Sequence, residues 1–201
     1  METSAAACFA MGDSLETIAH AAEASVNLVL SQSGLAAAEY LQEAFGIPYV
    51  CGVPYGGAFS ALLADALRTA AATGANAYPC TKCGGSGKTV AVIGEAVSAG
   101  STAAQLNLTG YAAHVLCPLP HAEALLAGGE SDAFAEGDMA RVLAEMQPDA
   151  VIADPLYRFI LPPGTQHIAL PHSAFSGRCY DKNIPDLTGS RFDAWLREVL
   201  L

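Results

Sequence analysis

Val90-Ala91-Val92-Ile93 is a continuous apolar run near the middle of the chain, and Gly94 follows it directly. A run without polar residues is typical of a strand whose two faces are both covered, as in a parallel sheet packed between helices. The residues after Gly94 are expected to form a helix through about Leu106. A buried strand followed by a helix is one half of a β-α-β unit, so this stretch predicts an α/β fold.

The same alternation extends in both directions from this strand. Further strands are predicted at residues 26–30, 48–51, 113–117, 150–153 and 167–170. Helices are predicted to begin near Ser14, to cover 35–45, to follow Gly57, to include 139–146 and to begin near a capping Ser190. Strands that alternate with helices favour parallel β-α-β units. We therefore expect Rossmann-like parallel sheets with helices on both faces.

One segment interrupts this alternation. Residues 73–88 are rich in glycine, cysteine and polar residues, and they read as a loop. We expect a first α/β lobe over residues 1–75, a connecting loop over 76–88 and a second Rossmann-like lobe over 89–201.

Composition and charge exclude several classes of partner. The 201 residues carry a net charge of −11, and 52% of them are apolar while 14% are charged. A strongly acidic chain lacks the basic face that binds nucleic acid. No apolar run reaches the roughly 18 residues of a membrane helix, and no signal peptide is visible, so we expect a cytoplasmic protein. The low charged fraction favours a surface covered by a partner subunit, as in a dimer.

Two glycine-rich segments resemble nucleotide-binding motifs only in part. Before Gly87-Lys88-Thr89, Lys82 stands where a phosphate loop needs its first glycine, and the segment precedes a strand instead of following one. After the central strand only Gly94 and Gly100 remain of the dinucleotide fingerprint. We expect neither ATP nor NAD to bind this chain.

Cys80 and Cys83 form a C-x-x-C pair within the loop. A structural zinc site needs four ligands. This pair would therefore bind a metal or a cluster only with further ligands from elsewhere, for example from a second subunit across an interface. The alternatives are that the cysteine pair takes part in redox chemistry or that it has no functional role. In a cytosolic protein, cysteines are more often thiols or ligands than disulfides.

His172 is the sharpest candidate for a functional residue. It follows the strand predicted at 167–170 and begins a Ser/Gly-rich loop, where open α/β sheets bind their ligands. Its imidazole can bind a metal, transfer a proton or form a hydrogen bond, and the alternative is a ring satisfied by backbone groups. Asp154 ends a neighbouring strand and is expected to cap a turn or to face a ligand.

Two regions together resemble the nitrogenase component 1 family. Residues 26–31 (VNLVLS) and 45–50 (FGIPYV), separated by a helix, resemble a strand-helix-strand segment of that family. Residues 149–154 (DAVIAD), followed by 170–177 (LPHSAFSG), resemble its C-terminal region. The order and approximate spacing agree from about residue 13 to residue 200. Family members are longer, so the chain would correspond to their C-terminal part.

The resemblance implies a function and a set of site residues. The family contains the nitrogenase molybdenum-iron protein, its assembly scaffold and the dark-operative tetrapyrrole reductases. It implies an oxidoreductase subunit that binds an iron-sulfur-type metallocofactor or a tetrapyrrole. An ATP-dependent iron-sulfur reductase and a homologous subunit, or a second copy in a homodimer, would be its partners. Activity is not expected of this chain in isolation.

The family pattern also assigns roles residue by residue. His172 would be the catalytic histidine and a cofactor ligand, and Ser31 stands where the family has a cysteine ligand. Gly94 begins the segment that would contact the cofactor, and Ser176 and Gly177 complete the C-terminal part of the site. A hydroxyl binds iron far less well than a thiolate. Ser31 therefore favours the alternative, a non-catalytic scaffold or binding module for a small ligand or metal cluster.

Overall fold

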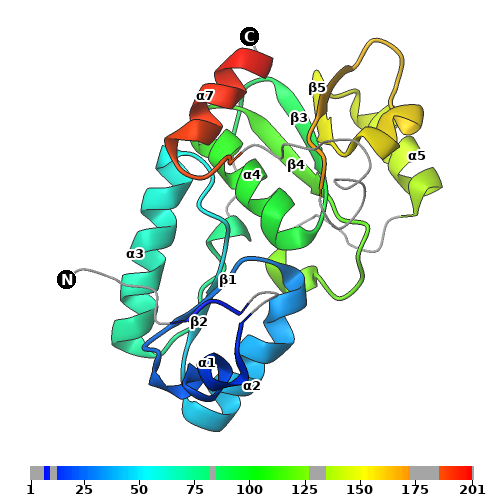
Figure 1. The fold of residues 1–201 in the computed structure, drawn as a ribbon. Helices are drawn as coiled ribbons and strands as arrows, with labels where there is room; N and C mark the ends of the chain where they lie inside the picture. The colour runs from blue at the N-terminus through cyan, green and yellow to red at the C-terminus, as the bar shows by residue number, and fades with distance from the viewer. Residues whose placement is uncertain (1–6, 10–12, 82–84, 127–134, 173–185, 201) are drawn as a thin grey trace.

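The computed structural model describes residues 7–9, 13–81, 85–126, 135–172 and 186–200. These residues form two parallel sheets with helices packed on them (Figure 1), so the predicted α/β fold class is confirmed. The first sheet has two strands, β1 (Asn27–Val29) and β2 (Tyr49–Cys51). The second has the order β4-β3-β5-β6, with β3 (Thr89–Ile93), β4 (Ala112–Leu116), β5 (Ala150–Ala153) and β6 (Gln166–Ala169).

Each predicted helix is present. The α-helices are α1 (Leu15–Ala19), α2 (Leu35–Phe45), α3 (Gly57–Thr73), α4 (Ala96–Leu108), α5 (Glu136–Met146) and α7 (Ser190–Val199). The 3₁₀ helices are η1 (Ala21–Glu23), η2 (Gln32–Gly34), η3 (Pro79–Thr81), η4 (Glu123–Leu125) and η5 (Pro155–Ile160).

Local signals set several of these boundaries. The Ser14 hydroxyl accepts a hydrogen bond from the Thr17 amide and caps α1, as N-cap serines do. Gly46 ends α2 in a left-handed conformation with φ 71°, which glycine adopts at little cost. The prediction that Ser190 caps the last helix is wrong, because Gly189 precedes α7 and no side chain caps it. Ser190 is the first residue inside that helix.

The central strand explains why its sequence has no polar residue. Val90 and Val92 belong to the larger core cluster, which includes residues of α4 and α7. Ala91 and Ile93 point to the opposite face, where they pack with Met139 of α5. Side chains alternate between the two faces of a strand, so a strand covered on both faces must be apolar at every position.

The segment predicted as a connecting loop is tied to the first sheet. Ala77 pairs with Val50 of β2 in a parallel bridge, and its carbonyl accepts a hydrogen bond of 3.1 Å from the Cys51 amide. The C-terminal part of the chain also returns to the first half. The Gly189 amide donates to the Pro54 carbonyl at 2.7 Å, and Tyr55 forms bridges with Thr188 and Gly189. The lobe boundaries at residues 75 and 88 remain predictions.

Candidate functional site

A pocket of about 260 Å³ lies at the carboxyl ends of β3 and β5, beside the residues that follow β6. Its walls consist of Val53, Tyr55, Val92, Ile93, Gly94, Ser98, Ala99, Thr102, Ile152, Ala153, Leu170, Pro171, His172, Asp186, Leu187 and Thr188. Most of these side chains are apolar, and hydroxyls, one imidazole and one carboxylate supply the polar groups. Ligands of open α/β sheets bind at this edge.

Two of the predicted site residues meet in this pocket. Gly94 follows β3 directly, and His172 lies three residues beyond the end of β6. The Leu170 amide donates to the Ala153 carbonyl at 2.9 Å, which extends the pairing of β5 with β6 by one residue. Pro171, which has no amide proton, stands at a position that does not donate in this ladder, so the proline removes no hydrogen bond from it. His172 comes next, is half-buried and forms part of the pocket wall.

Asp154 holds the backbone at His172. It follows β5 and its side chain is buried, with 2% of its surface exposed. Its Oδ1 accepts from the Leu156 amide at 3.0 Å and caps η5, while its Oδ2 accepts from the His172 amide at 2.9 Å. The predicted turn cap is therefore present. The contact with His172 had no sequence signal beyond the position of both residues at strand ends.

The amino end of α4 is occupied by a carboxylate of the chain itself. Glu95 is 4% exposed, and its Oε1 accepts from the Ser98 amide at 2.7 Å. Its Oε2 accepts from the amides of Val97 and Gln32, at 3.1 and 3.0 Å. Helix N-termini attract anions through their free amides and their dipole. A phosphate would have to displace Glu95 to bind at this helix.

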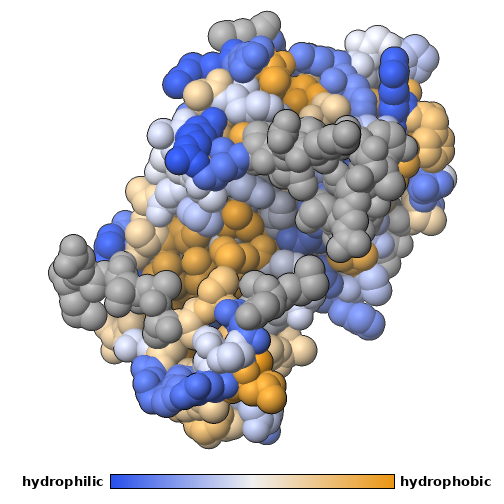
Figure 2. Space-filling model, viewed as in Figure 1, coloured by the Kyte–Doolittle hydropathy of each residue, from blue (hydrophilic) through white to orange (hydrophobic). Residues whose placement is uncertain are grey.

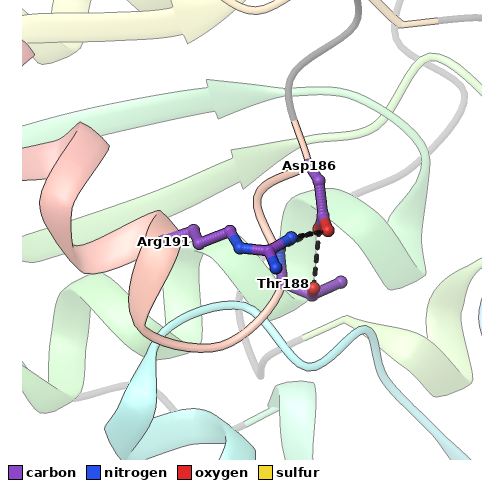
Figure 3. A network of polar contacts seen from close by, with 3 residues as sticks. All are labelled: Asp186, Thr188 and Arg191. Atoms are coloured by element: carbon purple, nitrogen blue, oxygen red, sulfur yellow. Dashed lines mark hydrogen bonds and ion pairs between the residues drawn. The ribbon is translucent and has the colours of Figure 1, made fainter.

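Asp186, Thr188 and Arg191 form a polar network beside the pocket (Figure 3). Asp186 Oδ1 accepts from the Thr188 amide at 3.0 Å and from its hydroxyl at 2.6 Å. The Arg191 guanidinium pairs with the other carboxylate oxygen of Asp186. Both partners of this ion pair are more than half exposed, so it contributes little to stability.

The structure does not bring Ser31 into the pocket with His172. Its side chain instead caps η2, with its Oγ 3.4 Å from the Ser33 amide nitrogen and 3.0 Å from the Ser33 hydroxyl. The next residue, Gln32, is the one that donates to Glu95. Ser31 therefore lies beside the contact that joins the first half of the chain to α4.

Cys80 is a buried core residue. It is 4% exposed, its thiol donates to the Leu125 carbonyl at 3.6 Å, and a Cβ added at Gly100 would lie 3.2 Å from its Cβ.

A second buried cysteine, Cys51, lies at the end of β2. Burial and the nearby Cys80 raise the pKa of Cys51 to about 12. Metal binding needs thiolates, which such burial disfavours.

The remaining predicted site residues, Cys83, Ser176 and Gly177, lie outside the described residues. Within the described ranges, no three side chains of histidine, cysteine, aspartate or glutamate are grouped so that they could hold a metal ion. The metal-binding role of Cys80 and Cys83 remains a prediction.

Comparison with known proteins gives no family. Neither a protein-family model nor a curated protein matches this chain. Among the helices of the described ranges, none combines the length and apolar character needed to cross a membrane.

Proposed function

We propose that this chain is the C-terminal portion of a cytoplasmic, nitrogenase-like oxidoreductase subunit that binds its cofactor at the His172 pocket. One observation carries the proposal: His172 and Gly94 converge on one pocket from separate strands at the carboxyl edge of a parallel sheet. Both are among the residues that the family pattern assigns to the cofactor site. An external ATP-dependent iron-sulfur reductase would deliver the electrons.

The ligands available in the pocket favour a tetrapyrrole over an iron-sulfur cluster. Clusters are held mainly by cysteine thiolates, and the described residues of the pocket wall include no cysteine. The iron of a tetrapyrrole can be held by a single histidine, and His172 would be that residue. Ligand sites usually enclose roughly 300–1,000 Å³. At about 260 Å³, this pocket would receive one edge of a macrocycle and leave the remainder outside.

Each part of the wall would have a distinct role toward such a cofactor. His172 would bind the metal or hold a proton at its imidazole, and Gly94 would allow the macrocycle to approach the backbone. Tyr55, Ile152 and Leu170 would exclude water from the bound edge. When bound, the tetrapyrrole would supply the redox chemistry that the protein side chains lack.

Ferric protoporphyrin is a suitable probe for this proposal. We expect anaerobically purified protein to bind one equivalent and to shift its absorption bands to those of a histidine-ligated iron. His172→Ala should abolish this shift. His114→Ala is the matched control, because His114 is an exposed residue of β4 that does not line the pocket. Equal spectra for wild type and His172→Ala would refute ligation by His172.

A non-catalytic module that binds a small neutral ligand is the second candidate. The modest volume and largely apolar wall of the pocket favour it, and Glu95 already fills the nearby anion-binding helix end. Indole is a neutral aromatic probe of suitable size. Binding of indole with nuclear magnetic resonance (NMR) shifts confined to the pocket, together with failure to bind ferric protoporphyrin, would favour this candidate over the first.

A further inference from the structure

We propose that Asp154 is a positioning residue that fixes His172 against the pocket, in addition to capping η5. This inference rests on the proposed role of His172 as the ligand-binding residue. Asp154 is not part of the pocket wall, so it would act only through His172.

The pairing of β5 with β6 shows why a side chain is needed at this point. The two strands are parallel, and Ala153 is in register with Ala169. In such a ladder every second residue of a strand donates to its neighbour, so the His172 amide is the next donor after Leu170. The main chain of β5 cannot serve it, because Pro155 begins η5 and leads the chain away. The Asp154 carboxylate takes the place of the missing carbonyl, at 2.9 Å from the His172 amide nitrogen.

Burial makes this contact strong. Asp154 has 2% of its surface exposed, which leaves water little access to its carboxylate, and its contact with the half-buried His172 is partly buried. Hydrogen bonds to a buried charged group are shorter and stronger than those between neutral groups, and their loss leaves an unsatisfied charge. The same carboxylate joins the turn after β5 to the residue after β6. A displacement of that turn would therefore be transmitted to His172.

A turn cap alone would make the same contact with Leu156 but would not need to reach His172. Asp154→Ser separates the two roles, because serine is a good N-cap but its hydroxyl is too short to span both amides. Asp154→Asn is the second variant. With its one oxygen kept on the local Leu156 amide as the cap of η5, its amide nitrogen would lie opposite the His172 amide, which then has no acceptor. Asp149→Asn is the matched control, since Asp149 accepts from the Thr89 amide at 2.8 Å, at the opposite end of β5.

The first test uses the ligand-free protein. In wild type, a scalar coupling across the hydrogen bond should connect the His172 amide nitrogen with the Asp154 carboxyl carbon. The His172 amide proton should move upfield in Asp154→Ser and Asp154→Asn and stay in place in Asp149→Asn. Absence of the coupling in wild type would overturn the proposal without any variant.

The second test is binding of ferric protoporphyrin. Both Asp154 variants should bind it about tenfold more weakly, the effect of losing one hydrogen bond to a charged group. Asp149→Asn should bind it as wild type does. If folded Asp154→Ser kept the wild-type affinity for ferric protoporphyrin and the wild-type His172 amide resonance, Asp154 would act only as a turn cap. If wild type binds no porphyrin while the amide shifts occur, the cofactor proposal fails and the positioning of His172 stands.

Discussion

Gln105 and Asp193 are 88 residues apart, yet their side chains together cap the amino end of α3. Gln105 Nε2 donates to Asp193 Oδ1 at 2.7 Å. The Gln105 Oε1 accepts from the Phe59 amide at 2.7 Å, and the Asp193 Oδ2 accepts from the Gly57 amide at 2.8 Å. This network joins α3, α4 and α7, and Gln105 is 1% exposed within it.

Gln105→Leu should strongly destabilise the fold. Leucine fills a similar volume but leaves the Phe59 amide without an acceptor and removes a donor from Asp193. We expect the free energy of unfolding to fall by about 2–4 kcal/mol in urea titrations followed by circular dichroism. Gln166→Leu is the control, because Gln166 is exposed and makes one surface hydrogen bond to the Val199 carbonyl. A loss at Gln105 no larger than the control's would show that the network contributes little.

Gly56→Ala should be costly for two separate reasons. Gly56 has a φ of 68°, and a Cβ added there would lie 2.2 Å from Cδ of Gln105. We expect a loss of more than about 2 kcal/mol by the same titration, because strain and a clash with a buried side chain combine. Gly137→Ala is the matched control, since that α5 residue has open space around its Cβ position and should become more stable by about 0.5 kcal/mol. Equal free energies of unfolding for Gly56→Ala and Gly137→Ala would rule out the close approach of Gly56 to Gln105.

Stability should fall in alkaline solution because of Cys51. The ordinary pKa of a cysteine thiol is 9.0, and burial raises the pKa of Cys51 to about 12 in the folded protein. Between these two values the unfolded chain releases the proton while the folded chain retains it, so the free energy of unfolding decreases as pH rises. Below pH 9 the thiol is protonated in both states and has no effect. Cys51→Ala should flatten this slope, whereas Cys8→Ala, at an exposed thiol, should not.

The chain should associate with a second copy or a homologous subunit. Leu28 and Leu30, in and just after β1, are 39% and 48% exposed, and Figure 2 shows an apolar area near β1 and α3. Exposed apolar patches of this kind mark interaction sites. Sedimentation equilibrium should give a mass of twice the 20.6 kDa of one chain at high concentration. A mass of 20.6 kDa at every concentration would exclude a homodimer.

The sequence predicted the elements of the fold far better than the contacts between distant polar groups. Apolar runs such as Val90–Ile93 identify strands because a strand that is buried on both faces must have an apolar residue at every consecutive position. The position of His172 just beyond the carboxyl end of a parallel strand followed from the same pattern. In contrast, nothing near Asp193 indicates that it caps a helix beginning at Gly57. Ser31 shows the converse, because a family position predicted a pocket residue and the local geometry made it a turn cap.

The pairing of Tyr55 with Thr188 and Gly189 has a consequence for biosynthesis. One wall of the pocket comes from residues 53–55 and another from residues 186–188, so the pocket combines early and late parts of the chain. While residues 186–200 are still inside the ribosomal exit tunnel, the nascent polypeptide lacks that second wall. Both walls of the pocket are therefore in place only once residues 186–189 have left the tunnel and paired with Pro54 and Tyr55.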